Sequence, residues 1–117
     1  MKIIVQHEKI NRQTGDKSYT DVAEVNAIEI APFANTMECL EYAYRWTNNV
    51  MGSWSIKEQY LPTRKSEPAL NGDYNSDVTV LHTRPDGMGQ RSTMMGDRMV
   101  VGGDTYEVAM AGFEKVK

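Results

Sequence analysis

Three side chains in this sequence could act as a nucleophile or a general base, and they lie far apart along the chain. Cys39 is the single cysteine, and His7 and His82 are the two histidines. A catalytic thiolate needs a histidine or a cation beside it, and the sequence places neither near Cys39. This cysteine falls on an apolar helix pattern, where a free thiol is usually a core residue. A small enzyme that uses these residues therefore stays an alternative, and the sequence favours a protein without catalytic activity.

Metal and acid–base chemistry have little support in the spacing of the remaining polar residues. Metal sites usually draw on a denser cluster of His, Cys and carboxylates, so neither a metal nor a cofactor is predicted. Paired carboxylates could serve general acid–base catalysis. Each aspartate candidate, however, lies beside Gly, Ser or Pro, where turn formation explains it better. These aspartates are Asp73, Asp77, Asp86, Asp97 and Asp104.

Two short segments are candidates for binding a partner. Trp46 and Trp54 bracket a predicted helix end and a polar loop. Either both indoles cap the core, which the residue type favours, or one is an anchor on a binding surface, where Trp and Arg carry most of the energy. Arg91 and the two hydroxyl residues after it either cap Asp97 and backbone groups or grip a partner or a phosphate. The predicted partner-binding residues are Trp46, Trp54, Arg91, Ser92, Thr93 and Asp97.

Composition and charge limit the classes of protein that fit. The chain has 117 residues, a formal net charge of −3 and one cysteine, so it forms no internal disulfide. No run approaches the ~20 apolar residues of a membrane span. We therefore expect one domain over 1–117, located in a reducing cytoplasm. Interspersed charges of both signs argue against duplex binding, which needs a concentrated basic face.

Binding of single-stranded nucleic acid is a second alternative. Aromatic side chains on which bases could stack lie near cations in the sequence, although the net negative charge disfavours this function. The residues concerned are Trp54, Tyr60, Tyr74, Arg64, Lys65 and Arg91.

The pattern of predicted strands and one helix indicates an α+β fold, a small antiparallel β-sheet with one main α-helix packed on it. These elements must position the residues named above. Asn35 as N-cap, with Glu38 three residues later, predicts a helix that ends at Thr47–Asn49. A shift in the apolar alternation predicts a bulge or a strand end near Ala27. Residues 52–75 are predicted to be an extended loop. Strands are predicted at 3–7, 19–30, 77–83, 98–101 and 106–110, with hairpin turns at 11–18 and 102–104 and a β-turn at 84–87.

Three blocks of this sequence resemble a known family. They run from Leu40 to Trp54, from Asp77 to Leu81, and from Arg91 through Asp97 to an Ala-Gly-Phe-Glu ending at 111–114. These blocks are similar to small accessory proteins of tailed bacteriophages and mobile elements, related to the YodL-like domain. The family pattern has Ser and Val where this chain has Met94 and Met95.

The resemblance implies a context rather than a chemistry. It implies a phage or mobile-element accessory protein in the cytoplasm of a bacterial host, with no catalytic residue to carry over. The sequence therefore favours a non-enzymatic protein-binding module whose partner is a host or phage protein. No membrane partner is expected, and an exposed strand edge would allow a homodimer.

Overall fold

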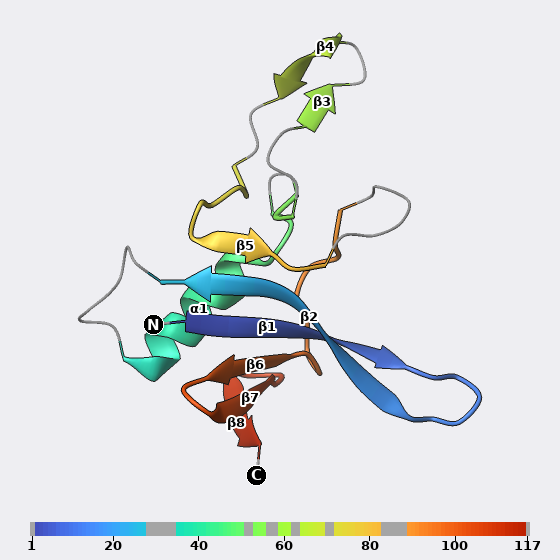
Figure 1. Cartoon of the computed structure of the whole chain (residues 1–117), viewed down its shortest axis with the longest axis vertical. Helices are drawn as coiled ribbons and strands as arrows, with labels where there is room; N and C mark the ends of the chain where they lie inside the picture. The colour runs from blue at the N-terminus through green and yellow to red at the C-terminus, as the bar shows by residue number, and fades with distance from the viewer. Residues whose placement is uncertain are drawn as a thin grey trace.

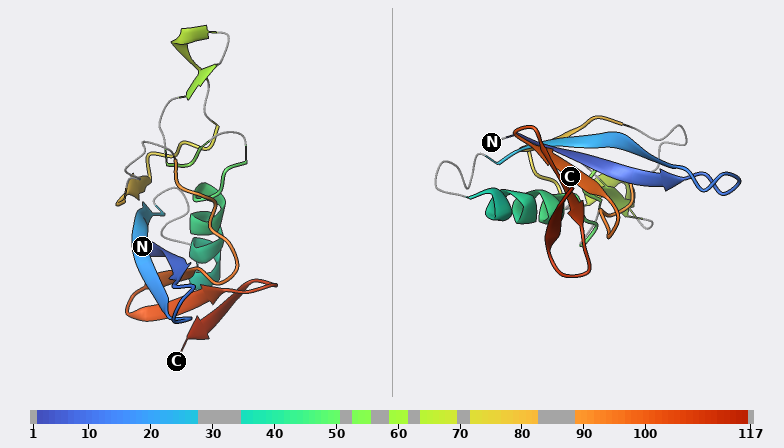
Figure 2. Two further views of the ribbon diagram at one scale, coloured as in Figure 1. Left: turned by 90° about the vertical axis from the view of Figure 1, so that its right-hand side faces the viewer. Right: turned by 90° about the horizontal axis from the view of Figure 1, so that it is seen from below.

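The computed structural model describes residues 2–27, 35–50, 53–55, 59–61, 64–69, 72–82 and 89–116. Its main feature is a six-stranded antiparallel sheet with the helix α1 (Thr36–Trp46) against one face (Figures 1 and 2). This architecture confirms the predicted α+β class. In spatial order the strands are β5 (Val78–Val80), β2 (Lys17–Asn26), β1 (Lys2–Ile10), β6 (Arg98–Val101), β7 (Asp104–Val108) and β8 (Phe113–Val116).

The hairpin of β1 and β2 forms the centre of the sheet. Gly15 N–H donates to Asn11 O within the turn, as the predicted hairpin at 11–18 requires. The register shifts between Val5, which lies opposite Ala23, and Gln6, which lies opposite Asp21. The extra residue between them makes a β-bulge, which the sequence analysis did not place. β2 ends at Asn26, which confirms the predicted strand end near Ala27, and residues 28–30 of the predicted strand lie outside the described residues.

The helix begins and ends as predicted. The Asn35 side-chain oxygen accepts a hydrogen bond from Glu38 N–H at 2.8 Å, and Thr47 is the C-cap. The inward face carries Cys39, Leu40 and Ala43, all buried, so the cysteine is a core residue as the apolar pattern predicted. No helix in the described part of the chain is long and apolar enough to cross a membrane.

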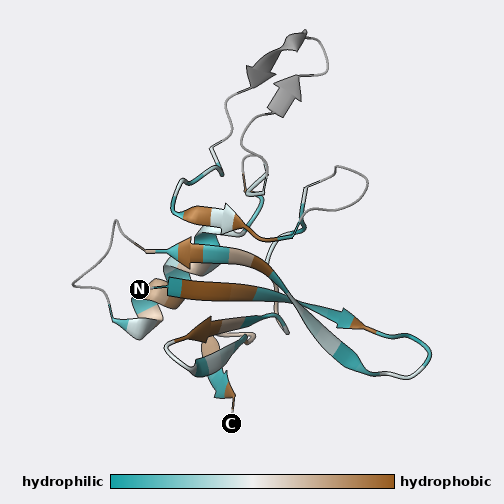
Figure 3. Cartoon of the chain, viewed as in Figure 1, coloured by the Kyte–Doolittle hydropathy of each residue, from teal (hydrophilic) through white to brown (hydrophobic). Residues whose placement is uncertain are grey.

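One apolar cluster joins the helix to the sheet. Trp54 completes it from the segment after the helix. Figure 3 shows apolar positions concentrated in the middle of the sheet, whereas the outer half of the β1–β2 hairpin is largely polar. The buried members are Ile3, Val5, Val22, Ala23, Val25, Ala27, Cys39, Leu40, Ala43, Trp54, Met99, Val101 and Val108.

The C-terminal strands form a meander. Gly102 and Gly103 have φ values of 57° and 89°, the backbone that a tight type I′ hairpin requires and that glycine adopts at low cost. This confirms the predicted turn between two strands. β7 begins at Asp104, two residues earlier than predicted, and β8 is an additional strand that the sequence analysis did not predict.

The prediction of an extended loop over 52–75 is wrong for part of that range. β3 (Gln59–Leu61) and β4 (Arg64–Ala69) pair antiparallel as a separate two-stranded sheet, which Figure 1 shows standing away from the main sheet. Pro68 is compatible with this pair because each strand of a two-stranded ribbon has an unpaired outer edge. The turn predicted at 84–87 lies outside the described residues.

Candidate functional site

A surface hollow of about 510 Å³ lies beside the outer half of β1. The pairing of β1 with β6 stops at Gln6 and Arg98, the first residue of β6, whereas β1 continues to Ile10. Among the described residues, this part of β1 therefore has no backbone partner on its β6 side. The loop that precedes β6 lies against this edge instead. The residues that line the hollow, called the β1 hollow below, are Glu8, Lys9, Ile10, Arg12, Arg91, Met94, Met95 and Asp97.

A bidentate ion pair between Arg91 and Asp97 forms one side of the β1 hollow. Both terminal guanidinium nitrogens donate to the carboxylate at 2.7 Å. Asp97 is fully buried and also accepts hydrogen bonds from the backbone N–H groups of Glu8 and Met94, each at 2.8 Å. Burial alone would raise the pKa of Asp97, but the hydrogen bonds from Arg91, Glu8 and Met94 outweigh it and hold that pKa below its usual value.

The ion pair takes the place of a strand beside β1. Asp97 accepts from Glu8 N–H, and Arg91 donates to Glu8 O at 3.3 Å. Two side chains thus satisfy the backbone groups of Glu8, which lies beyond the last residue pair between β1 and β6. A second donor on Arg91 reaches Ser92 O at 2.9 Å. Each terminal nitrogen of Arg91 therefore makes two hydrogen bonds within the chain, and its role is to hold the loop against β1.

A chain of hydrogen bonds runs inward from His7. Thr47 Oγ1 donates to Ala43 O at 2.8 Å, and Thr93 Oγ1 donates to Thr47 Oγ1 at 2.7 Å. Because the Thr93 proton is used in this way, His7 Nε2, at 3.0 Å from Thr93 Oγ1, must be the donor to it. The geometry therefore requires a proton on Nε2 of His7, which the neutral Nε2–H tautomer supplies.

The surroundings of His7 favour the same neutral form. The residue is 6% exposed, and its ring lies edge-on to the Trp54 ring, with 6.1 Å between the two ring centres. Burial lowers the pKa of His7 to about 4; Asp97 acts in the opposite direction, and Arg91 adds to the lowering. At neutral pH this histidine is an uncharged structural donor.

Trp54 is buried rather than presented to a partner. It is 1% exposed, its indole N–H donates to Arg91 O at 2.9 Å, and its backbone N–H donates to the Asn49 side chain. The indole thus supports the Arg91 loop from the core side. Trp46 is half-buried, with the Arg45 guanidinium 4.2 Å from its ring centre and Tyr42 beside it.

The structure brings most of the predicted partner-binding residues together, but their polar groups bond within the chain; three of them are buried, whereas Arg91 stays exposed. Thr93 is buried and its N–H donates to Thr47 O, while Ser92 Oγ accepts from Asn49 N–H. Together with Arg91, Asp97 and Trp54 they fix the loop to the helix end and to β1. Trp46 lies apart from this group, among its own helix neighbours.

The apolar groups that the β1 hollow offers to solvent are different ones. Ile10, Met94 and Met95 are 52%, 53% and 59% exposed. The only sequence signal for them was the concentration of methionines near 94–95, which fits either core filling or an adaptable contact surface. Ile10 gave no signal, because a single apolar residue at the end of a strand is common on protein surfaces.

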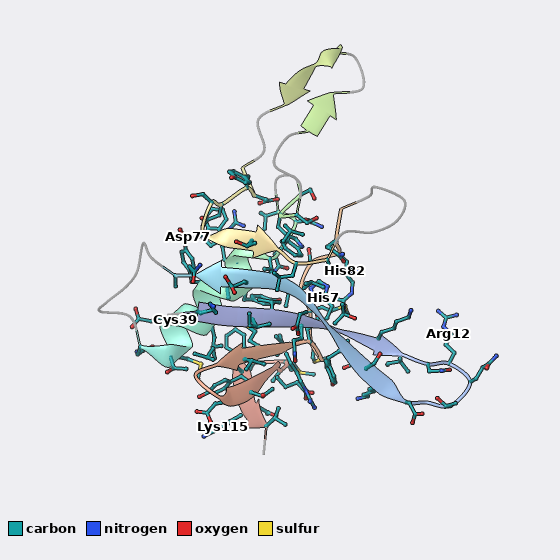
Figure 4. The ribbon with its side chains drawn as sticks, in the orientation of Figure 1. His7, Arg12, Cys39, Asp77, His82 and Lys115 are labelled. Atoms are coloured by element: carbon teal, nitrogen blue, oxygen red, sulfur yellow. The ribbon has the colours of Figure 1, made fainter. Side chains whose placement is uncertain are left out.

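The residues considered for catalysis do not converge in the described structure. Cys39 lies on the buried face of α1, His7 is held by Thr93, and His82 is exposed (Figure 4). No hydrogen bond or ion pair joins these three among the described residues. In the same residues no three His, Cys, Asp or Glu side chains gather as metal ligands.

The aromatic residues considered for nucleic-acid stacking do not form a common surface in the described structure. Trp54 is in the core, whereas Tyr74 is exposed. The side chains of Tyr60, Arg64 and Lys65 lie outside the described residues.

Comparison of the chain with protein-family models, with curated proteins and with solved structures gives no match. The family resemblance noted in the sequence therefore stays a prediction.

Proposed function

We propose that this chain is a non-enzymatic protein-binding module and that the β1 hollow is its contact surface. The observation that carries the proposal is the exposure of three apolar side chains, Ile10, Met94 and Met95, around a single hollow. Clustered apolar exposure is characteristic of interaction sites. Unbranched methionine side chains adapt to the shape of a partner.

The support beneath these side chains is rigid, which favours binding. The Arg91–Asp97 ion pair and the indole N–H of Trp54 fix the loop backbone. Met94 N–H itself donates to Asp97. A partner would therefore meet a preformed backbone and would have to order only the exposed side chains, which lowers the entropic cost of association.

Charge indicates the chemistry of the partner. Lys9 and Arg12 line the β1 hollow and make no ion pair with any described residue. Arg91 and Asp97 neutralise each other, so Glu8 is the one acidic group that remains against these two cations. We infer a partner segment with an apolar side chain that contacts the methionines and carboxylates that approach Lys9 and Arg12. The family resemblance, as a further proposal, would make that partner a bacterial host protein.

A capture experiment from bacterial lysate tests this function. The tagged chain is compared with the double variant Met94→Ser/Met95→Ser, which keeps the backbone hydrogen bond to Asp97. Met110→Ser is the matched control, because Met110 is 90% exposed and lies outside the β1 hollow. We expect a discrete protein that survives nuclease treatment, is lost with the double variant and is retained with the control.

The other outcomes separate the alternatives. Capture that disappears on nuclease treatment would favour single-stranded nucleic acid as the ligand. Equal capture by the double variant would place the contact on another surface and contradict the role of the β1 hollow.

A further inference from the structure

In the described part of the chain, no strand pairs with the outer edge of β2 over half its length. β5 pairs with Ala23–Val25, and Leu81 N–H donates to Val22 O. From Lys17 to Asp21, no described residue forms a backbone hydrogen bond on that edge. Figures 1 and 2 show this half of the β1–β2 hairpin extending beyond the rest of the described sheet.

The direction of the free backbone groups follows from the contacts of β1. Glu8 N–H donates to Asp97, away from β2, and Glu8 lies opposite Tyr19. Opposite residues in an antiparallel pair either both bond to each other or both point outward. The N–H and C=O groups of Tyr19 therefore point to the open edge. By the two-residue period of a strand, the groups of Lys17 and Asp21 point there too.

The sequence of this edge is complementary to itself when it runs antiparallel. In Lys17-Ser18-Tyr19-Thr20-Asp21, reversal about Tyr19 places lysine opposite aspartate and serine opposite threonine. Opposite charges and paired hydroxyl side chains are favourable cross-strand neighbours. Neither Lys17 nor Asp21 makes an ion pair with a described residue.

We propose that a second copy of this chain binds this edge, so that the two β2 strands pair antiparallel about a two-fold axis at Tyr19. On such an axis, one residue must lie opposite the same residue of the second copy and exchange two backbone hydrogen bonds with it. Tyr19 has both outward backbone groups that this needs. Each Lys17 then lies opposite Asp21 of the other copy, which gives two equivalent ion pairs.

Two further observations fit this pairing. The free edge ends at Val22, where Leu81 begins to occupy it, so the open length matches the self-complementary segment. The Tyr19 ring is already held by the Arg98 guanidinium, 4.2 Å from its centre.

The antiparallel arrangement places the two sheets at opposite ends of the shared hairpins, and the β1 hollow lies along the other edge of the hairpin. The dimer is therefore independent of the proposed binding function.

Sedimentation equilibrium of the full chain tests the dimer. Over about 1 μM to 1 mM, we expect a reversible monomer–dimer equilibrium. Asp21→Lys places lysine opposite lysine in both symmetric pairs and Lys17→Asp places aspartate opposite aspartate, so each should raise the dissociation constant about tenfold or more. The double variant Lys17→Asp/Asp21→Lys restores opposite charges and should return the constant to within about threefold of the original.

Hydrogen exchange of the unmodified chain provides a second readout that does not depend on the variants folding. Tyr19 N–H should gain protection as the concentration rises, whereas Thr20 N–H, which faces β1, should not change. A chain that stays monomeric at the highest concentration would overturn the proposal. So would a dimer that neither single variant weakens, or one that the double variant does not restore.

Discussion

Protonation of His7 should destabilise the fold as the pH falls from about 6.5 to about 4. The folded state holds the pKa of this residue at about 4, whereas its ordinary value is 6.5. The unfolded chain therefore binds a proton first as the solution is acidified, and the free energy of unfolding declines. The full contribution of neutral His7 is present above about pH 6.5 and is lost by about pH 4.

The size of this effect follows from the pKa difference. A difference of about 2.5, at about 1.4 kcal/mol for each pKa unit, corresponds to about 3.5 kcal/mol of unfolding free energy, of which about 3 kcal/mol is lost by about pH 4. The residue is 6% exposed, so solvent screening takes little from this value. Urea unfolding followed by tryptophan fluorescence is a suitable assay, because the Trp54 ring contacts His7 and is buried in the folded state.

A comparison of two variants isolates the contribution of His7. His7→Gln keeps a side-chain donor for Thr93 but cannot titrate, so its unfolding free energy should fall about 3 kcal/mol less than that of the original chain over the same range. His82→Gln replaces an exposed histidine and should keep the full decline. If the original chain and His7→Gln show the same pH dependence, the reasoning about His7 is refuted.

Four substitutions, one of them a matched control, test the loop and the core. Asp97→Ala should lower the free energy of unfolding by about 3 kcal/mol, the lower end for a broken buried ion pair, because the freed Arg91 side chain can reach water. The control Asp104→Ala breaks an exposed ion pair with Lys115 and should change the free energy of unfolding by less than about 0.5 kcal/mol. Trp54→Ala should cost about 3–5 kcal/mol, and a small loss would show that the indole is not part of the core. Cys39→Ser should cost about 1–3 kcal/mol, and rapid thiol labelling of the native chain would contradict the burial of Cys39. Chemical denaturation measures all four changes in the free energy of unfolding.

Local chemistry predicted the elements whose cause is local. Asn35 begins a helix because its side chain caps it, and Gly102–Gly103 closes a hairpin because both residues adopt positive φ. The pair β3–β4 was missed because its loop-like composition also fits short strands, and pairing depends on tertiary context. The bulge near Ala23 was missed although the consecutive apolar residues Val22 and Ala23 break the two-residue alternation there; only the later shift near Ala27 was considered.

The candidate site was predicted only in part, because its position depends on contacts between residues far apart in the sequence. The sequence left open whether Arg91 caps Asp97 or grips a partner, and whether Trp54 caps the core or anchors a partner. The structure shows Arg91 paired with Asp97 and Trp54 buried. Where this group lies in the fold was not predicted. That depends on Glu8, which lies 89 residues from Asp97 along the chain. No local pattern contains such a distant contact. The exposed residues of the β1 hollow became evident once β1 and the loop before β6 were placed side by side.

The position of β1 between β2 and β6 has a consequence for the order of folding during synthesis. The hairpin at residues 2–26 leaves the ribosome before the later strands, and a two-stranded hairpin alone is marginally stable. The strand β6, and the Arg91–Asp97 pair that satisfies Glu8, are translated after it, beyond the helix and the segments that follow the helix. Contacts this distant in sequence form slowly. β1 therefore gains its second neighbouring strand only after β6 has been synthesised, and a nascent chain cut off before Arg91 would expose Val5 and His7 to proteases.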